Sequence, residues 1–274
     1  MSNCKVIALT NQKGGVGKTI TAVNLGVSLV QQGKKVLLID ADAQANLTMA
    51  LGYNRPDDIP ITLSTVMQNI IDDTTLDVSQ GIIHHNEGVD LLPSNIEMSG
   101  FEVRLINAMS RERVLKTYIN EVKKNYDYVL IDCMPSLGMI TINALAADSV
   151  IIPTQPHYLS AKGLELLLRS VSMVKRQINP KLRIDGILMT MVMPRTNISK
   201  EITATVKSAY GKKIKVFDTE IPHSIRAVEA TAEGKSIFAY DKSGKVAAAY
   251  EQLGKEVAEI GEKQRNQNRA DRIR

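Results

Sequence analysis

The sequence has 274 residues, of which 44% are hydrophobic and 23% are charged. At about 150 residues per domain, this length fits one large α/β domain or two small ones, and the composition excludes wholesale disorder and collagen-like repeats. No segment approaches the roughly 18 to 20 consecutive apolar residues that span a bilayer, so we expect neither a secretory nor an integral membrane protein. The two cysteines, Cys4 and Cys133, are too few for a disulfide framework or a four-thiolate zinc site, and they fit a reducing cytoplasm.

The basic residues are concentrated in two segments. The chain has 34 Lys and Arg against 29 Asp and Glu, a net charge of +5. From Arg195 to Lys215 six basic residues stand against the single acid Glu201, and residues 262–274 carry five bases against two acids. Such clusters fit contact with a polyanion such as nucleic acid, although a solvated basic face is the commoner explanation of any one cluster.

Short apolar runs alternate with helical periodicity along the chain, which predicts strands that alternate with helices. The expected strands are Lys5–Thr10, Lys35–Asp40, Val89–Leu92, Tyr128–Asp132, Ser149–Pro153 and Ile184–Val192. The expected helices are Thr19–Gln32, Phe101–Lys124, Ile140–Ala147, Ala161–Ile178, Ser199–Ala209 and Lys245–Ile260. This pattern predicts an α/β fold with a single doubly wound, mostly parallel sheet and helices on both faces. We expect one domain over residues 1–261, followed by a polar basic tail over residues 262–274.

A glycine-rich segment, Asn11-Gln12-Lys13-Gly14-Gly15-Val16-Gly17-Lys18-Thr19, separates the first expected strand from the first expected helix. Backbone N–H groups of such a turn surround phosphate oxygens, because glycine permits close approach and unusual backbone angles. Gln12 stands where the standard phosphate loop has its first glycine, but the strand-to-helix context is kept. The segment predicts a nucleotide site formed by Lys13, Gly14, Gly15, Val16, Gly17, Lys18, Thr19 and Ile20.

Three carboxylates follow the ends of expected strands. Asp132 and Asp40 each end a strand, and Asp42 comes two residues after Asp40. The carboxyl edge of an open α/β sheet is where ligands bind, so we expect these acids beside the phosphate loop. Thr19, Asp40 and Asp132 are candidate magnesium ligands, because Mg²⁺ uses hydroxyl and carboxylate oxygens together with phosphates. The alternative for Asp42 and Asp132 is helix N-capping, a common role of Asp.

Four motifs together resemble the ParA/Soj branch of the deviant Walker ATPases. They are NQKGGVGKT, LLIDAD-x-Q-x-N, LIDC-x-PSLG and the later IP-x-x-IR…E…GK-x-I-x-x-YD block. The likeness runs from about Lys5 to Ala258, and the last block is particular to the partition branch. It implies a P-loop NTPase fold and an enzyme that hydrolyses ATP with Mg²⁺.

The same resemblance implies roles for individual residues. The chain would form a homodimer when ATP is bound, with Lys13 reaching the partner's nucleotide. Lys18 would neutralise phosphate charge, and Asp42 would position the attacking water, so Lys13, Lys18 and Asp42 are the expected catalytic residues. Adenine would pack near Met193 and Pro222. Arg195 and Arg226 match two arginines that bind DNA without sequence preference, although their spacing alone also fits surface arginines in ordinary ion pairs.

The function implied is DNA partition, of a plasmid or a chromosome, driven with a ParB-type partner in the cytoplasm at the nucleoid. The alternative is a related ATPase that positions a protein cargo, such as a chemosensory or conjugation assembly. His223 departs from the family pattern, in which an arginine often follows the proline. Residues 262–274 have only Ala270 and Ile273 as apolar residues, which disfavours a membrane-binding helix.

Overall fold

The computed structural model describes residues 4–74 and 77–273, and of residues 158–162 and 268–273 it describes the backbone alone. Within this part of the chain, a seven-stranded sheet has the order β3-β4-β2-β5-β1-β6-β7, and every neighbouring pair is parallel except β3 with β4. The strands are β1 Lys5–Leu9, β2 Val36–Ala41, β3 Ile83–His84, β4 Asp90–Leu92, β5 Tyr128–Cys133, β6 Ser149–Thr154 and β7 Arg183–Met189. The predicted mostly parallel sheet is confirmed.

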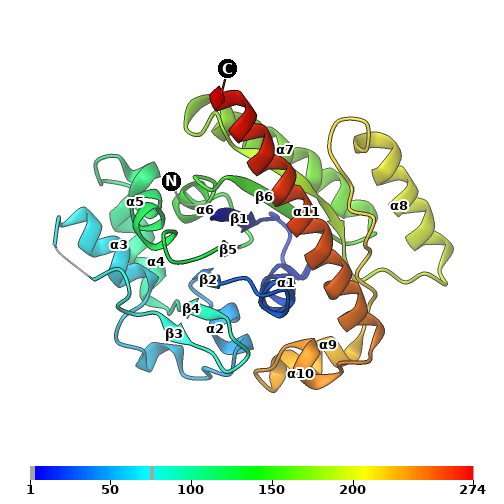
Figure 1. The fold of residues 1–274 in the computed structure, drawn as a ribbon, viewed down its shortest axis with the longest axis horizontal. Coiled ribbons are helices and arrows are strands. Elements are labelled where there is room, and N and C mark those ends of the chain that lie inside the picture. Colours follow the sequence, from blue (N-terminus) through cyan, green and yellow to red (C-terminus); the bar gives the residue numbers. More distant parts are fainter. Residues whose placement is uncertain (1–3, 75–76, 274) are drawn as a thin grey trace.

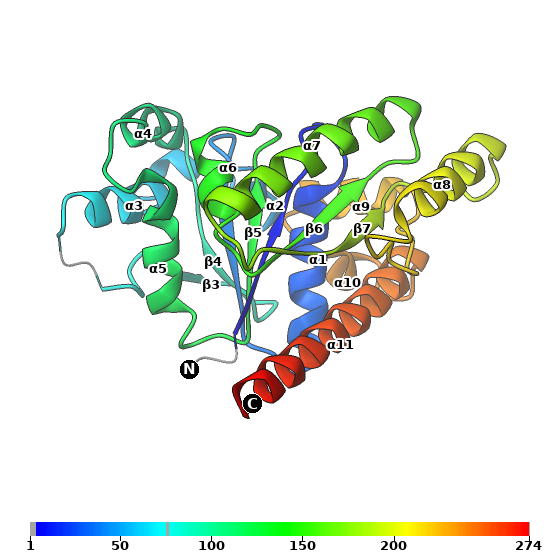
Figure 2. The same ribbon diagram turned by 90° about the horizontal axis from the view of Figure 1, so that it is seen from above.

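Helices cover both faces of this sheet, as the alternating pattern predicted (Figure 1, Figure 2). Their bounds are α1 Lys18–Gln31, α2 Asn46–Ala50, α3 Leu63–Ile71, α4 Glu97–Leu105, α5 Val114–Val122, α6 Met139–Ala144, α7 Tyr158–Gln177, α8 Asn197–Tyr210, α9 Ile225–Ala232, α10 Ile237–Tyr240 and α11 Lys245–Ile273. Short 3-10 turns occur at Pro56–Asp58 and Arg111–Arg113. No helix in the described ranges is both long enough and apolar enough to cross a membrane.

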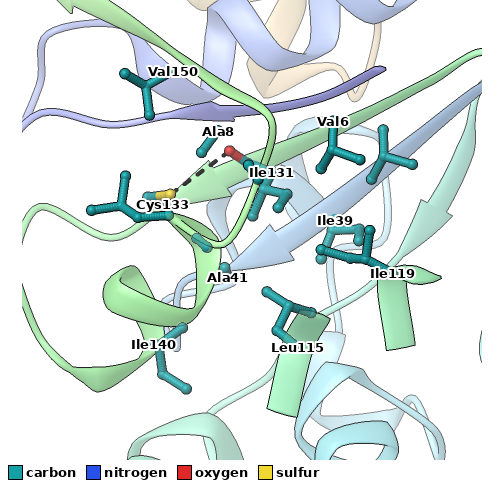
Figure 3. Packing of buried hydrophobic residues seen from close by; sticks show 14 of the residues in the cluster. Val6, Ala8, Ile39, Ala41, Leu115, Ile119, Ile131, Cys133, Ile140 and Val150 are labelled. Atoms are coloured by element: carbon teal, nitrogen blue, oxygen red, sulfur yellow. Dashed lines mark hydrogen bonds between the residues drawn. The ribbon is translucent and has the colours of Figure 1, made fainter. Parts of the chain in front are cut away.

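Two hydrophobic layers hold the helices to the sheet. Side chains alternate along a strand, so in β1 Val6 and Ala8 join one layer while Ile7 and Leu9 join the other. Helices α3 to α8 pack in the first layer, and α1, α2 and α9 to α11 pack in the second. Figure 3 shows the first layer, where Leu115 of α5 faces the β-strand side chains. Burial on both faces explains why the strand segments are continuous apolar runs.

The strand register brings the expected site residues to one edge of the sheet. β5 lies between β1 and β2, and Asp132 is level with Leu9 of β1 and with Asp40 of β2. The loop after β1 therefore begins next to both carboxylates. This is the position where the strand order reverses, and ligands of open α/β sheets bind there.

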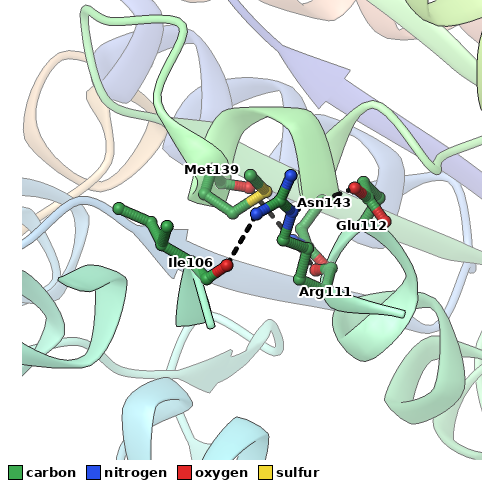
Figure 4. A network of polar contacts seen from close by, with 5 residues as sticks. All are labelled: Ile106, Arg111, Glu112, Met139 and Asn143. Carbon is green, nitrogen blue, oxygen red and sulfur yellow. Dashed lines mark hydrogen bonds and ion pairs between the residues drawn. The ribbon is translucent and has the colours of Figure 1, made fainter. Parts of the chain in front are cut away.

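The single helix predicted over Phe101–Lys124 is wrong, because α4 ends at Leu105 and α5 begins only at Val114. Ser110 between them has a left-handed backbone with φ of 51°. The break is held by Asn143 of α6, whose amide donates to Arg111 O at 2.7 Å and whose oxygen accepts from Leu115 N (Figure 4). A contact from a distant helix thus overrides the local helical periodicity.

The strand predicted to run to Val192 ends at Met189. Met191 has a left-handed backbone with φ of 52°, so the methionines of this segment do not continue one face of a strand. A single parallel bridge links Val192 with Pro222 instead. The segment after β7 consequently turns across the carboxyl edge of the sheet.

The boundary predicted between residues 261 and 262 falls inside α11, which continues to Ile273. Gln264 donates to Asp185 Oδ1 at 2.9 Å, and the guanidinium of Arg265 lies 5.9 Å from the ring centre of Tyr128. Asp185 also forms a buried ion pair of 2.6 Å with Lys5. The first part of the predicted tail is therefore packed on the amino edge of the sheet, while Arg274 lies outside the described residues.

Candidate functional site

The loop between β1 and α1 has the backbone that a phosphate cradle needs. Gly15 and Gly17 have φ of 69° and 82°, in the left-handed region that favours glycine. A Cβ built on Gly15 would meet nothing within 4 Å, so this residue faces open space. Lys18 begins α1 and is buried, and its Nζ lies 3.5 Å from Lys13 O. Burial lowers the pKa of Lys18, and the nearby Asp132 opposes this effect.

Asn11, the first residue of the glycine-rich segment, and two residues that no sequence motif indicated, Gln155 and Thr190, hold this loop in place. Asn11 donates to Pro153 O at 2.7 Å, Gln155 donates to Gly15 O at 2.7 Å, and Thr190 donates to Val16 O at 2.8 Å. These bonds tie the loop to the ends of β6 and β7, which are more than 130 residues away in sequence. A usable signal existed, since Asn11, Gln155 and Thr190 are all polar residues that follow parallel strands.

Lys13, the residue expected to reach across a dimer, contacts its own chain in this structure. Its Nζ lies 3.5 Å from Gln155 Oε1, and its backbone N–H donates to Asn11 Oδ1 at 3.0 Å. The side chain is half-buried at the carboxyl edge of the sheet. Lys13 therefore belongs to the same cluster as the phosphate loop.

Thr19 and Asp132 meet as the sequence predicted. The Thr19 hydroxyl donates to Asp132 Oδ2 at 2.6 Å, while Asp132 Oδ1 is buried and has no hydrogen-bond partner. Burial, and then the neighbouring Asp40, raise the pKa of Asp132 to about 8. A buried carboxylate oxygen without a donor beside a hydroxyl fits a small hard cation such as Mg²⁺. Among the described residues no group of three or more His, Cys, Asp or Glu side chains is arranged to hold a metal, so phosphate oxygens and water would complete the shell.

Asp40 is fully buried, and both its carboxylate oxygens already have donors. Oδ2 accepts from the backbone and the hydroxyl of Thr48 at 2.8 and 2.7 Å, and Oδ1 accepts from Asp42 N at 3.2 Å. Burial raises its pKa to about 7, against these hydrogen bonds. Asp40 thereby fixes the first turns after β2 next to the Thr19–Asp132 pair.

Asp42 lies in a turn just beyond β2 and is not a helix cap. Its Oδ1 accepts from Gln44 N at 3.0 Å, whereas the N-cap position of α2 is Ala45, which makes no side-chain cap. Asp132 lies inside β5 and is not a helix cap either, because the N-cap of α6 is Gly138. Neither acid therefore serves as the N-cap that was the alternative interpretation.

Ile20 lies in the first turn of α1, and the predicted base contacts and DNA arginines lie on two segments that the Val192–Pro222 bridge joins. Met193 is 48% exposed and directly follows Val192, the residue that bridges to Pro222. Arg195 precedes α8 and is exposed, with no ion pair in the described residues. Arg226 in α9 is exposed as well, and its Nη1 lies 2.9 Å from Asp241 Oδ1.

Comparison with known proteins agrees with this geometry. A family model described as an AAA domain matches residues 4–184. The sporulation initiation inhibitor protein Soj of Bacillus subtilis is 44% identical over 259 residues, covering 94% of this chain and 99% of that protein. The chromosome partitioning protein ParA of Myxococcus xanthus is 38% identical, over 92% of this chain and 87% of that protein.

A solved structure extends the comparison. The chain resembles a cobyrinic acid a,c-diamide synthase from Mycobacterium smegmatis with bound ATP analog and magnesium, with a TM-score of 0.80 and 34% identity over 92% of this chain and 93% of that one. The sequence identities to Soj and ParA extend over more than nine-tenths of the chain. The geometry of the phosphate loop supports the same family assignment. The chain belongs to the ParA/Soj family of P-loop ATPases.

Proposed function

We propose that this ATPase is a DNA-partition switch. It binds ATP with Mg²⁺, forms a homodimer in that state and binds DNA without sequence preference. A ParB-type partner then stimulates hydrolysis and releases the DNA, so that a plasmid or chromosome is partitioned in the cytoplasm at the nucleoid. The 44% identity to Soj and the 38% identity to a chromosome partitioning ParA support this proposal.

In the nucleotide step, each residue acts through charge and position. Lys18 neutralises developing charge on the phosphates, and Thr19 with Asp132 holds the Mg²⁺, which supplies further electrostatic stabilisation when bound. Asp42 would orient the attacking water, and Asp40, whose oxygens already accept hydrogen bonds, would assist at the metal. Lys13 leaves Gln155 and reaches the nucleotide of the second copy. The magnesium and ATP analog in the solved structure at 34% identity support this use of the loop.

One observation carries the link from ATP to DNA. The bridge between Val192 and Pro222 joins two segments, and each contains an expected base contact followed by an expected DNA arginine. Arg195 is two residues after Met193, and Arg226 is four residues after Pro222. A nucleotide that packs on Met193 and Pro222 therefore orders the same two segments that present the arginines.

The deciding experiment is binding to a random-sequence duplex as a function of salt, with ATP, ADP or no nucleotide. We expect ATP-specific binding that strengthens as salt falls and that is lost in the variant Arg195→Ala plus Arg226→Ala. A preparation that hydrolyses ATP but shows no ATP-dependent DNA binding would contradict the proposal.

A second candidate, an ATPase that positions a protein cargo, is favoured by the apolar surface around Arg226. Ile225 and Val228 of α9 are 70% and 59% exposed, and Arg226 between them is paired with Asp241. Exposed apolar residues beside a neutralised arginine suit a protein surface better than a phosphate backbone. Loss of partner-stimulated turnover in Ile225→Ser plus Val228→Ser, for a wild-type chain that shows no ATP-dependent DNA binding, would favour this candidate.

A further inference from the structure

Helix α8 carries a line of basic residues that the proposed function does not use. Lys200 and Lys207 are seven residues apart, so they lie on one side of the helix, about 10 Å from each other along its axis. Ala204 between them is exposed and small, which leaves room for a surface to approach the helix closely. Arg195 precedes the amino end of this line.

The line leads into an open groove of about 620 Å³ at the carboxyl end of α8. Its lining includes the acid Asp218 and four lysines, Lys207, Lys212, Lys213 and Lys215. In both views α8 lies at the edge of the molecule on the side away from α3 (Figure 1), and Figure 2 shows it beyond β7.

Two lysines of the groove form ion pairs with acids. Lys207 pairs with Glu220 at 2.8 Å, and Lys215 pairs with Glu256 of α11 at 3.2 Å. Glu256 is buried and also accepts from the backbone and hydroxyl of Thr219 at 2.9 and 2.5 Å. These contacts join the groove wall to α11.

The other two lysines of the groove are not paired with an acid in the described part of the chain. Lys212 and Lys213 are exposed, and neither forms an ion pair with any residue that the structure describes. Lys200 is also exposed and unpaired within the described ranges. Glu201 is the one acid on α8, and it lies away from the side that Lys200 and Lys207 share, since adjacent helical residues point about 100° apart.

We infer that the DNA surface extends from Arg195 along α8 into this lysine groove, with Lys200, Lys212 and Lys213 contacting phosphates of one duplex. The 14 residues of α8 span about 21 Å, which corresponds to about six base pairs of duplex at 3.4 Å each. This inference rests on the proposed DNA binding and adds a second contact region to it. The contacts carry no sequence information, because they are made to the backbone alone.

The test compares salt dependence of DNA binding by the full chain with ATP, for wild type and Lys212→Ala plus Lys213→Ala. Each lost phosphate contact lowers the slope of log K against log salt by about 0.9, so the double variant is expected to lose about 2. Its affinity at about 0.1 M salt is expected to fall at least about tenfold. The variant Lys212→Arg plus Lys213→Arg keeps both charges and is expected to keep the wild-type slope.

The control is Lys181→Ala plus Lys242→Ala, two exposed lysines outside the groove that form no ion pair in the described residues, and it is expected to leave slope and affinity unchanged. The thermal unfolding midpoint of each variant reports whether it folds. An unchanged slope and affinity in the folded Lys212 and Lys213 variant, where wild-type binding depends on ATP and on Arg195 and Arg226, would overturn this inference and leave the proposed function standing. Absence of ATP-dependent binding in wild type would overturn both.

Discussion

The Thr19 hydroxyl and Asp132 Oδ2 lie 2.6 Å apart, so the first turn of α1 is bonded directly to the end of β5. Asp132 Oδ1, the other oxygen, has no partner and is buried. One oxygen of Asp132 therefore accepts a hydrogen bond and the other has no donor, at the point where the phosphate loop leads into α1.

Thr19→Val is expected to weaken the apparent Mg²⁺ affinity in the presence of nucleotide by about tenfold to hundredfold, because a hydrogen bond to a charged group is worth about 1.5 to 3 kcal/mol. Titration of ATP hydrolysis with Mg²⁺ measures this. Thr19→Ser retains the hydroxyl and serves as the control. Equal magnesium dependence in Thr19→Val and Thr19→Ser would show that the hydroxyl does not act at the metal.

Asp42→Ala is expected to keep ATP binding and ATP-dependent dimerisation but to reduce turnover at least about a hundredfold. The loss follows because an oriented acid at the attacking water contributes about 10² to 10⁴ in rate. Steady-state phosphate release, with nucleotide binding measured in parallel, tests the assignment. Normal hydrolysis by this variant would refute it.

Lys13→Gln is expected to bind ATP but to lose the ATP-dependent dimer. In the single chain Lys13 lies 3.5 Å from Gln155 Oε1, and the proposed dimer transfers its charge to the second nucleotide. Light scattering with and without ATP measures the molar mass of the protein in solution and so distinguishes monomer from dimer. A dimer that forms as well as in wild type would count against the role of Lys13 across the interface.

Asn24→Ala is expected to lower the free energy of unfolding by about 1 to 3 kcal/mol, because it leaves a buried N–H without a partner. Asn24 Oδ1 accepts from Ile237 N at 2.7 Å, and Asn24 Nδ2 donates to Ile20 O at 2.8 Å, which joins α1 to α10. Urea denaturation measures the change. Asn120→Ala, on the exposed side of α5, is the control and should stay within about 0.5 kcal/mol of wild type.

Because of Glu256, the free energy of unfolding is expected to decrease at acid pH. Burial alone would raise its pKa, but hydrogen bonds from Thr219, Lys215 and Asp218 N outweigh burial and lower the pKa below the usual value of 4.5. A depressed pKa in the folded state means that the stabilisation is present above pH 4.5 and is lost as the pH falls through the folded pKa.

Glu256→Gln is therefore expected to cost about 1 to 3 kcal/mol at neutral pH and to make stability less dependent on pH below about 4.5. Urea denaturation at several pH values measures both effects. Glu259→Gln, an exposed position of the same helix, is the control. A pH dependence equal to that of wild type would contradict the role of Glu256.

The sequence by itself determined the class of fold and the central motif of the site. Apolar runs such as Tyr128–Asp132 have the length and composition of strands buried on both faces, and they alternate with helical periodicity. The segment from Lys13 to Thr19 needs a left-handed backbone at two positions, and the sequence has glycine at both of them, Gly15 and Gly17. Both features are local, so a reading of neighbouring residues suffices for them.

Only the tertiary structure decided the features that depend on distant residues. Asn143 breaks the helix predicted over Phe101–Lys124, Gln155 and Thr190 hold the phosphate loop, and Gln264 fastens the predicted tail to Asp185. The partners in these hydrogen bonds are about 30 to 175 residues apart in the chain. Local spacing carries no information about such pairs, because the strand order of the sheet, and not the order of the sequence, brings them within hydrogen-bond distance.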